Sequence, residues 1–65
     1  MRMNVNEKIK QYLQDHGIKQ TFLAEKTGIA QEKLSRMLSK NRKLSADELV
    51  KISNALGVNP NIFLD

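Results

Sequence analysis

The sequence predicts an all-α fold of five helices in a single domain, residues 1–65. Apolar residues recur at spacings of three and four along most of the chain, and no stretch alternates with a two-residue period. Polar capping residues and isolated glycines divide this pattern into short segments. The chain has no cysteine and no dense set of histidine, aspartate and glutamate, so we expect neither disulfides nor a metal site. A chain this small must be held by good helix packing or by a second copy of itself.

The first helix is predicted to begin at a capping box, in which Asn4 precedes Glu7 by three residues. Gly17 ends it, and Ile18 is expected to fill the core beneath the connection. The side chains that recur at helical spacing between these signals are Val5, Ile9, Tyr12, Leu13 and His16.

The second and third helices are predicted from Lys19 or Gln20 to Thr27 and from Ala30 to Ser39, with Gly28 between them. A chain that stops one helix and turns sharply favours a left-handed backbone, which glycine adopts at low cost. Ala24 is small enough to let the two helix backbones approach each other. The residues expected to face a shared core are Leu23, Ala24, Ile29, Leu34, Met37 and Leu38.

The fourth helix is predicted to open at a second capping box, Ser45 to Glu48, and to close at Gly57. Its apolar face carries Leu49, Ile52, Ala55 and Leu56. Asn59 followed by Pro60 predicts a cap and the first residue of a short terminal helix. We expect Ile62, Phe63 and Leu64 to cover the core against the first and fourth helices, and any apolar surface left over would suit a dimer interface.

Positive charge is concentrated in one part of the chain. Eleven lysines and arginines oppose seven acidic residues, and no acid occurs between Lys33 and Lys43. Such a block favours a polyanionic partner, nucleic acid before anionic lipid, although charge runs are more often a solvated surface. The block lies on and just after the third helix, which favours the nucleic-acid interpretation. Its basic residues are Lys33, Arg36, Lys40, Arg42 and Lys43.

Two helices that cross steeply through a glycine turn form a helix-turn-helix, here about residues 19–39, whose second helix enters the DNA major groove. The whole chain from about Val5 to Leu64 then resembles the lambda-repressor and Cro family of XRE-like transcriptional regulators. The resemblance rests on Gln20, Leu23-Ala24-Glu25-Lys26, Gly28-Ile29, the Leu34 to Leu38 spacing, and Leu49 through Gly57-Val58. It implies a compact five-helix domain that binds operator DNA, commonly as a two-fold dimer on a palindromic site.

Three residues depart from the family pattern. Lys19 and Ala30 stand where the family often has a Ser or Thr cap, and a missing cap costs roughly 1 kcal/mol. Glu32 in the first turn of the third helix partly offsets this through the helix dipole. Phe22 occupies a position that is usually polar and exposed; we expect it to pack against the first helix or the chain start rather than to contact a partner.

Five residues of the third helix are predicted to contact base edges: Gln31, Glu32, Lys33, Ser35 and Arg36. The resemblance makes Gln31 the first of them, and a glutamine amide can bind adenine through two hydrogen bonds. Arg36 suits guanine, while Lys33 can reach a base or a phosphate. Glu32 can accept from cytosine or pair with Arg36 four residues on, and the sequence favours neither.

Phosphate contacts are predicted on both sides of this helix, at Lys19, Gln20, Lys40, Asn41, Arg42 and Lys43. The resemblance assigns Gln20 a grip on the DNA backbone, and the free amides at the start of its helix favour an anion. The others are flexible polar or basic residues that can also serve only to keep the loops solvated, so we expect Arg42 or Lys43 to contact phosphate more than Lys40.

Other function classes fit poorly. His16 is the only histidine, no carboxylate pair or nucleophile cluster is present, and the glycines are isolated, so an enzyme, a cofactor or a small-molecule ligand is not expected. No apolar run approaches a membrane span, which indicates a cytoplasmic protein. A repressor is favoured over an activator because so short a chain has little surface for recruiting polymerase. The alternative is a protein–protein interaction module or an antitoxin-like partner-binding protein.

Overall fold

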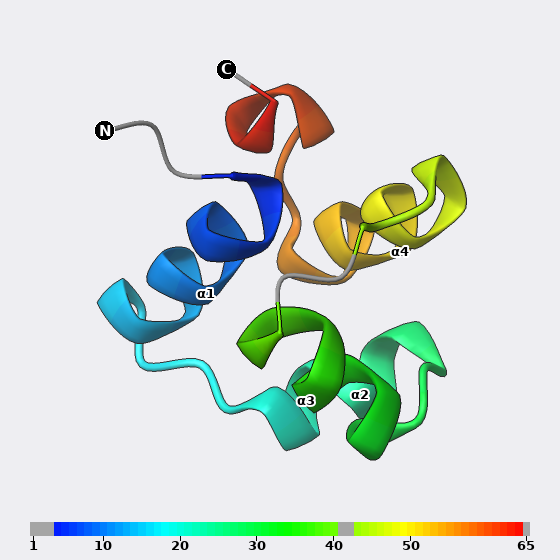
Figure 1. Ribbon diagram of the computed structural model, residues 1–65. Helices are drawn as coiled ribbons and strands as arrows, with labels where there is room; N and C mark the ends of the chain where they lie inside the picture. Colours follow the sequence, from blue (N-terminus) through cyan, green and yellow to red (C-terminus); the bar gives the residue numbers. More distant parts are fainter. Residues whose placement is uncertain (1–3, 41–42, 65) are drawn as a thin grey trace.

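The computed structural model describes residues 4–40 and 43–64 and places four α-helices and one 3₁₀ helix in them (Figure 1). The elements are α1 (Val5–Asp15), α2 (Gln20–Thr27), α3 (Gln31–Ser39), α4 (Ala46–Leu56) and η1 (Pro60–Phe63). No strand occurs in these residues, which confirms the all-α class.

The five-helix count is wrong, because the last element is a single 3₁₀ turn. Pro60 follows the cap Asn59, as predicted, but the chain then closes i→i+3 bonds: Ile62 N donates to Asn59 O at 3.1 Å and Leu64 N to Asn61 O at 3.1 Å. Tight turns of this kind rarely extend beyond four residues. The segment therefore covers the core with a short 3₁₀ turn and does not form a fifth α-helix.

Both predicted capping boxes are present. At the start of α1, Glu7 N donates to Asn4 Oδ1 at 2.9 Å and Asn4 N donates to Glu7 Oε1 at 3.2 Å. At the start of α4, Glu48 N donates to Ser45 Oγ at 3.2 Å and Ser45 N donates to Glu48 Oε1 at 3.0 Å. Each box pairs backbone N–H groups that have no partner inside the helix, and so fixes where the helix begins.

The turn between α2 and α3 depends on Gly28. Its φ is 76°, in the left-handed region, and its N–H donates to Ala24 O at 2.9 Å. The Thr27 hydroxyl donates to Leu23 O at 2.8 Å and accepts from Ile29 N at 3.2 Å. These bonds pair the end of α2 and direct the chain immediately into α3, as the glycine position predicted.

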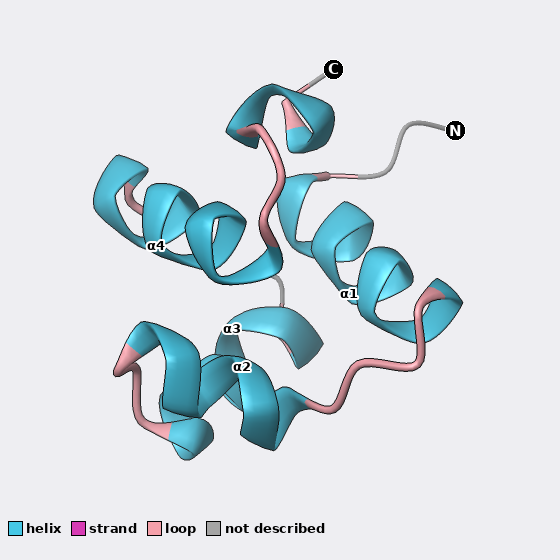
Figure 2. Cartoon of the chain, turned by 180° about the vertical axis from the view of Figure 1, so that it is seen from behind, coloured by secondary structure: helices cyan, strands magenta, loops and turns pink. Residues whose placement is uncertain are grey.

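The core lies where all five elements meet. In Figures 1 and 2, α1 and α4 stand on opposite sides, the α2–α3 pair closes one end, and η1 covers the other. The Phe63 ring meets Tyr12 edge-on, with centroids 5.8 Å apart. The buried apolar side chains are Ile9, Leu13, Leu23, Leu34, Met37, Leu38, Ile52 and Phe63.

Two expectations about apolar side chains need correction. Phe22 is not buried: it is 44 % exposed, and Lys26 Nζ lies 5.6 Å from its ring centroid. Leu23 and Ala24 occupy the inward side of α2, so the residue before them points outward. At the C-terminal end Phe63 alone is buried, whereas Ile62 and Leu64 are 47 % and 58 % exposed.

Candidate nucleic-acid interface

Helix α3 separates its side chains cleanly into two faces. Leu34, Met37 and Leu38 are buried against the core. The opposite face carries the polar residues predicted to contact bases: Gln31, Glu32, Lys33 and Arg36 are exposed, and Ser35 is half-buried. The buried face fixes the rotation of the helix, so the polar face must point to solvent.

Four of the five predicted base-contacting residues gather around one surface hollow of about 390 Å³, lined by Gln31, Glu32, Ser35 and Arg36. An amide, a carboxylate, a hydroxyl and a guanidinium together can donate to and accept from base edges. The hollow therefore presents the hydrogen-bonding groups of α3 as one set.

Glu32 and Arg36 do not form the ion pair that their spacing allowed. Within residues 4–40 and 43–64 the ion pair in the structure joins Lys33 Nζ to Glu48 Oε2 at 3.3 Å. Among the described residues Glu32 and Arg36 are therefore not paired with each other.

Lys33 does not line the hollow and is instead paired with Glu48, a residue that the sequence assigned only to a helix cap. The Glu48 side chain is 19 % exposed and that of Lys33 is 62 % exposed. The hydrogen bond from the Ser45 backbone N–H is the main cause of the lowered pKa of Glu48; burial opposes it, and Lys33 and the Ser45 hydroxyl lower the pKa further. Nothing in the spacing of residues 33 and 48 signals this pair, because it depends on the tertiary arrangement that brings the start of α4 within reach of α3.

The start of α2 offers unpaired backbone donors, as predicted. Lys19 provides no side-chain cap, and the first helical hydrogen bond runs from Leu23 N to Lys19 O at 3.2 Å. The N–H groups before Leu23 therefore have no partner within the helix and, with the helix dipole, favour an anion. Gln20 is half-buried at this position and Lys19 is exposed beside it.

The start of α3 is uncapped as well, since Ala30 makes no side-chain cap bond. At its other end, Lys40 and Lys43 are both exposed. Asn41 and Arg42, also predicted to contact phosphate, lie outside the described residues. At this end of α3 the described cations are therefore Arg36 in its last turn and Lys40 and Lys43 in the segment that follows.

The structure also bears on the other function classes. No group of histidine, cysteine, aspartate or glutamate in residues 4–40 and 43–64 could hold a metal ion. Within the same ranges, no helix has both the length and the apolarity needed to cross a membrane.

Residues 8–61 match the family pattern of the Cro/C1-type helix-turn-helix DNA-binding domain. The chain belongs to this family. The match includes α2, the Gly28 turn, α3 and α4, and so covers the polar hollow and the flanking cations described above. This Cro/C1-type domain is therefore a DNA-binding domain of the XRE-like transcriptional regulators, as its sequence indicated.

A solved structure supports the assignment. The N-terminal DNA-binding domain of SinR from Bacillus subtilis is 34 % identical to this Cro/C1-type domain, with a TM-score of 0.79. The similarity covers 94 % of this chain and 90 % of that one. No curated protein sequence matches the chain. The fold and the DNA-binding class thus rest on the family pattern and on this structural relative.

Proposed function

We propose that this regulator is a sequence-specific repressor that acts in the cytoplasm at a palindromic operator in double-stranded DNA. The observation that carries the proposal is the hollow on α3, where four hydrogen-bonding side chains of different chemistry gather on the solvent side of a helix whose other side is fixed in the core. Polar side chains of this kind suit base edges, whereas a protein-binding helix would present apolar or aromatic anchors.

In this proposal α3 lies in the major groove and its residues discriminate bases. Arg36 donates two hydrogen bonds to guanine, and Gln31 pairs with adenine through its amide. Glu32 accepts from the cytosine amino group and repels phosphates at other positions, which disfavours incorrect sequences. Ser35 can contact a base as donor or acceptor.

Phosphate contacts on both sides of the groove would supply most of the affinity. At the start of α2, the free backbone amides and the side chains of Lys19 and Gln20 would bind the phosphates of one DNA strand. On the other side the proposed contacts are Lys40 and Lys43, together with Asn41 and Arg42.

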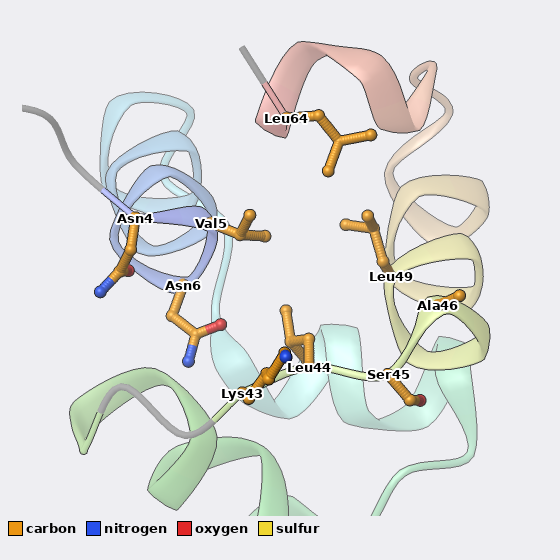
Figure 3. Close-up of a pocket in the computed structure, with 9 residues that line it drawn as sticks. All are labelled: Asn4, Val5, Asn6, Lys43, Leu44, Ser45, Ala46, Leu49 and Leu64. Atoms are coloured by element: carbon orange, nitrogen blue, oxygen red, sulfur yellow. The ribbon is translucent and has the colours of Figure 1, made fainter.

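We further propose that the domain, residues 1–65, binds as a homodimer. A groove of about 550 Å³ opens beside the segment after α3, and Figure 3 shows Val5, Leu44, Leu49 and Leu64 pointing toward one another across it. Leu64, which lines this groove, is an exposed apolar side chain. A two-fold interface joins a surface patch to itself, so a face with both a groove and an exposed apolar side chain suits a second copy. The two half-sites would then lie about one helical turn, roughly 34 Å, apart.

Selection of bound duplexes from a random DNA library tests the proposal directly. Enrichment of a palindromic site is the expected result. Arg36→Ala should then relax one base position by roughly 1–3 kcal/mol. By contrast, Lys43→Ala should weaken all sequences alike and lower the salt slope by about one.

Two results would contradict the proposal. A change of base preference in Lys43→Ala would show that the division between base and phosphate contacts is wrong. If no sequence were enriched, the better hypothesis would be an antitoxin or an interaction module. Its partner protein would then bind in the apolar groove lined by Val5, Leu44, Leu49 and Leu64.

A further inference from the structure

The two oxygens of the Glu48 carboxylate make two different contacts, one within α4 and one to α3. Oε1 accepts from Ser45 N at 3.0 Å and so closes the capping box of α4. Oε2 lies 3.3 Å from Lys33 Nζ, on the helix that contacts DNA. Because the capping box holds the carboxylate in place, Lys33 meets a fixed negative charge and not a mobile surface group.

Lys33 is the only cation in the first turn of α3, and it follows Gln31 and Glu32, two residues that line the hollow. An unpaired lysine there would be a flexible point charge, able to contact a phosphate of any sequence. Such a contact raises affinity for correct and incorrect DNA alike and so lowers the ratio between them. The partner of Lys33 therefore affects specificity, although it lies on another helix.

We propose that Glu48 is a specificity-determining residue: it holds the Lys33 ammonium away from DNA phosphates, and so keeps sequence-independent binding weak. This inference rests on the proposed function. Lys33 then contributes little to the phosphate contacts, in contrast to Lys43, which is exposed and has no ion-pair partner among the described residues.

The sequence offers a well-matched test. Glu48→Gln removes the charge that holds Lys33 but retains the cap, since glutamine serves at this position of a capping box. Asp47→Asn is the control, because Asp47 is an exposed acid in the same turn of α4 and does not pair with Lys33. Each protein would be titrated with a random duplex and with the site selected by the wild type, at salt from about 50 to 200 mM.

A released Lys33 should add one phosphate contact. Glu48→Gln should therefore bind the random duplex more tightly than the wild type, with a salt slope steeper by about 0.9. Over a fourfold change of salt this slope corresponds to an additional factor of about 3.5 in affinity. The ratio of selected-site to random-duplex affinity should fall, and Lys33→Gln in the same protein should abolish the gain.

Two outcomes would overturn the inference: an equal gain in Asp47→Asn, or a gain that persists in the Lys33→Gln, Glu48→Gln double variant. Either would mean that only the total charge matters. If Glu48→Gln is not folded at the assay temperature, two single lysine variants test the inference instead. Lys33→Gln should leave the salt slope of random-duplex binding unchanged, whereas Lys43→Gln should lower that slope by about 0.9. An equal loss in both would contradict the proposal.

The random duplex separates this inference from the proposed function. Failure of the wild type to enrich any sequence would refute sequence-specific repression but would leave the random-duplex comparison valid. Enrichment of a site without coupling between Lys33 and Glu48 would refute only the role given to Glu48.

Discussion

The hydrogen bond between Asn6 and Met37 should be one of the most sensitive points of the fold. Asn6 is 4 % exposed, and its Nδ2 donates to the Met37 carbonyl at 2.8 Å. Met37 lies in the last turn of α3, where carbonyls have no N–H partner within the helix. A side chain of α1 thus pairs a backbone group of α3, the helix that we propose contacts DNA.

Asn6→Ala removes this donor from a buried carbonyl, and losing a buried hydrogen bond in this way costs roughly 1–3 kcal/mol. Taking about 2 kcal/mol, a domain of this size should lose about 8–16 °C in melting temperature. Circular dichroism at 222 nm, the helix band, would measure the loss. Asn54→Ala is the matched control, because Asn54 is exposed on α4 and surface changes usually stay within about 0.5 kcal/mol.

A second substitution distinguishes the hydrogen bond from packing. Asn6→Asp keeps the size of the side chain, but an ionised carboxylate cannot donate to the Met37 carbonyl. This variant should be strongly destabilised near neutral pH and partly recover in acid, where the protonated carboxyl can donate. If Asn6→Ala and Asn54→Ala melted at the same temperature, the bond would contribute nothing and the reasoning would be refuted.

Three further predictions concern helix ends. Ala30→Ser should add the missing cap of α3 and raise the free energy of unfolding in urea by about 1 kcal/mol; no gain would mean that the hydroxyl does not reach the backbone. Gly28→Ala should lower the free energy of unfolding by about 1–2 kcal/mol through backbone strain alone, since a Cβ there meets nothing within 4 Å. Gly28→Asn should lower this free energy less, because asparagine adopts the left-handed conformation more easily. The lowered pKa of Glu48 means that its stabilising contribution is fully present above the ordinary value of 4.5 and is lost as the pH falls through the folded value. The melting-temperature gap between wild type and Glu48→Gln should therefore be wider near pH 7 than near pH 3, and a constant gap would contradict it.

The local features of the fold could be predicted because their causes lie within a few residues. The capping boxes at Asn4 and Ser45 and the turn at Gly28 each use neighbouring groups, so spacing alone identifies them. The start of α3 differs from its expected position by one residue, since Ala30 is the cap and not the first helical residue.

Features that depend on packing could not be predicted in the same way. The Asn6–Met37 bond spans 31 residues, and the Lys33–Glu48 pair joins two helices that local periodicity treats separately. Phe22 is more exposed than its apolar character predicts, because Leu23 and Ala24 already occupy the inward side of α2. The polar face of α3 could be predicted because the buried face of a helix determines its exposed face.

These contacts between helices matter because α3 has little stability of its own. It has nine residues and no N-terminal side-chain cap, and helices shorter than about 12–15 residues are marginal in water. Its last turn is bonded to Asn6 of α1, and its first turn is paired with Glu48 of α4. The direction of the side chains that we propose contact DNA is thus influenced by residues on α1 and α4. A substitution at Asn6 should consequently act through the placement of the whole helix, whereas a substitution at Glu48 should act through one side chain and its charge.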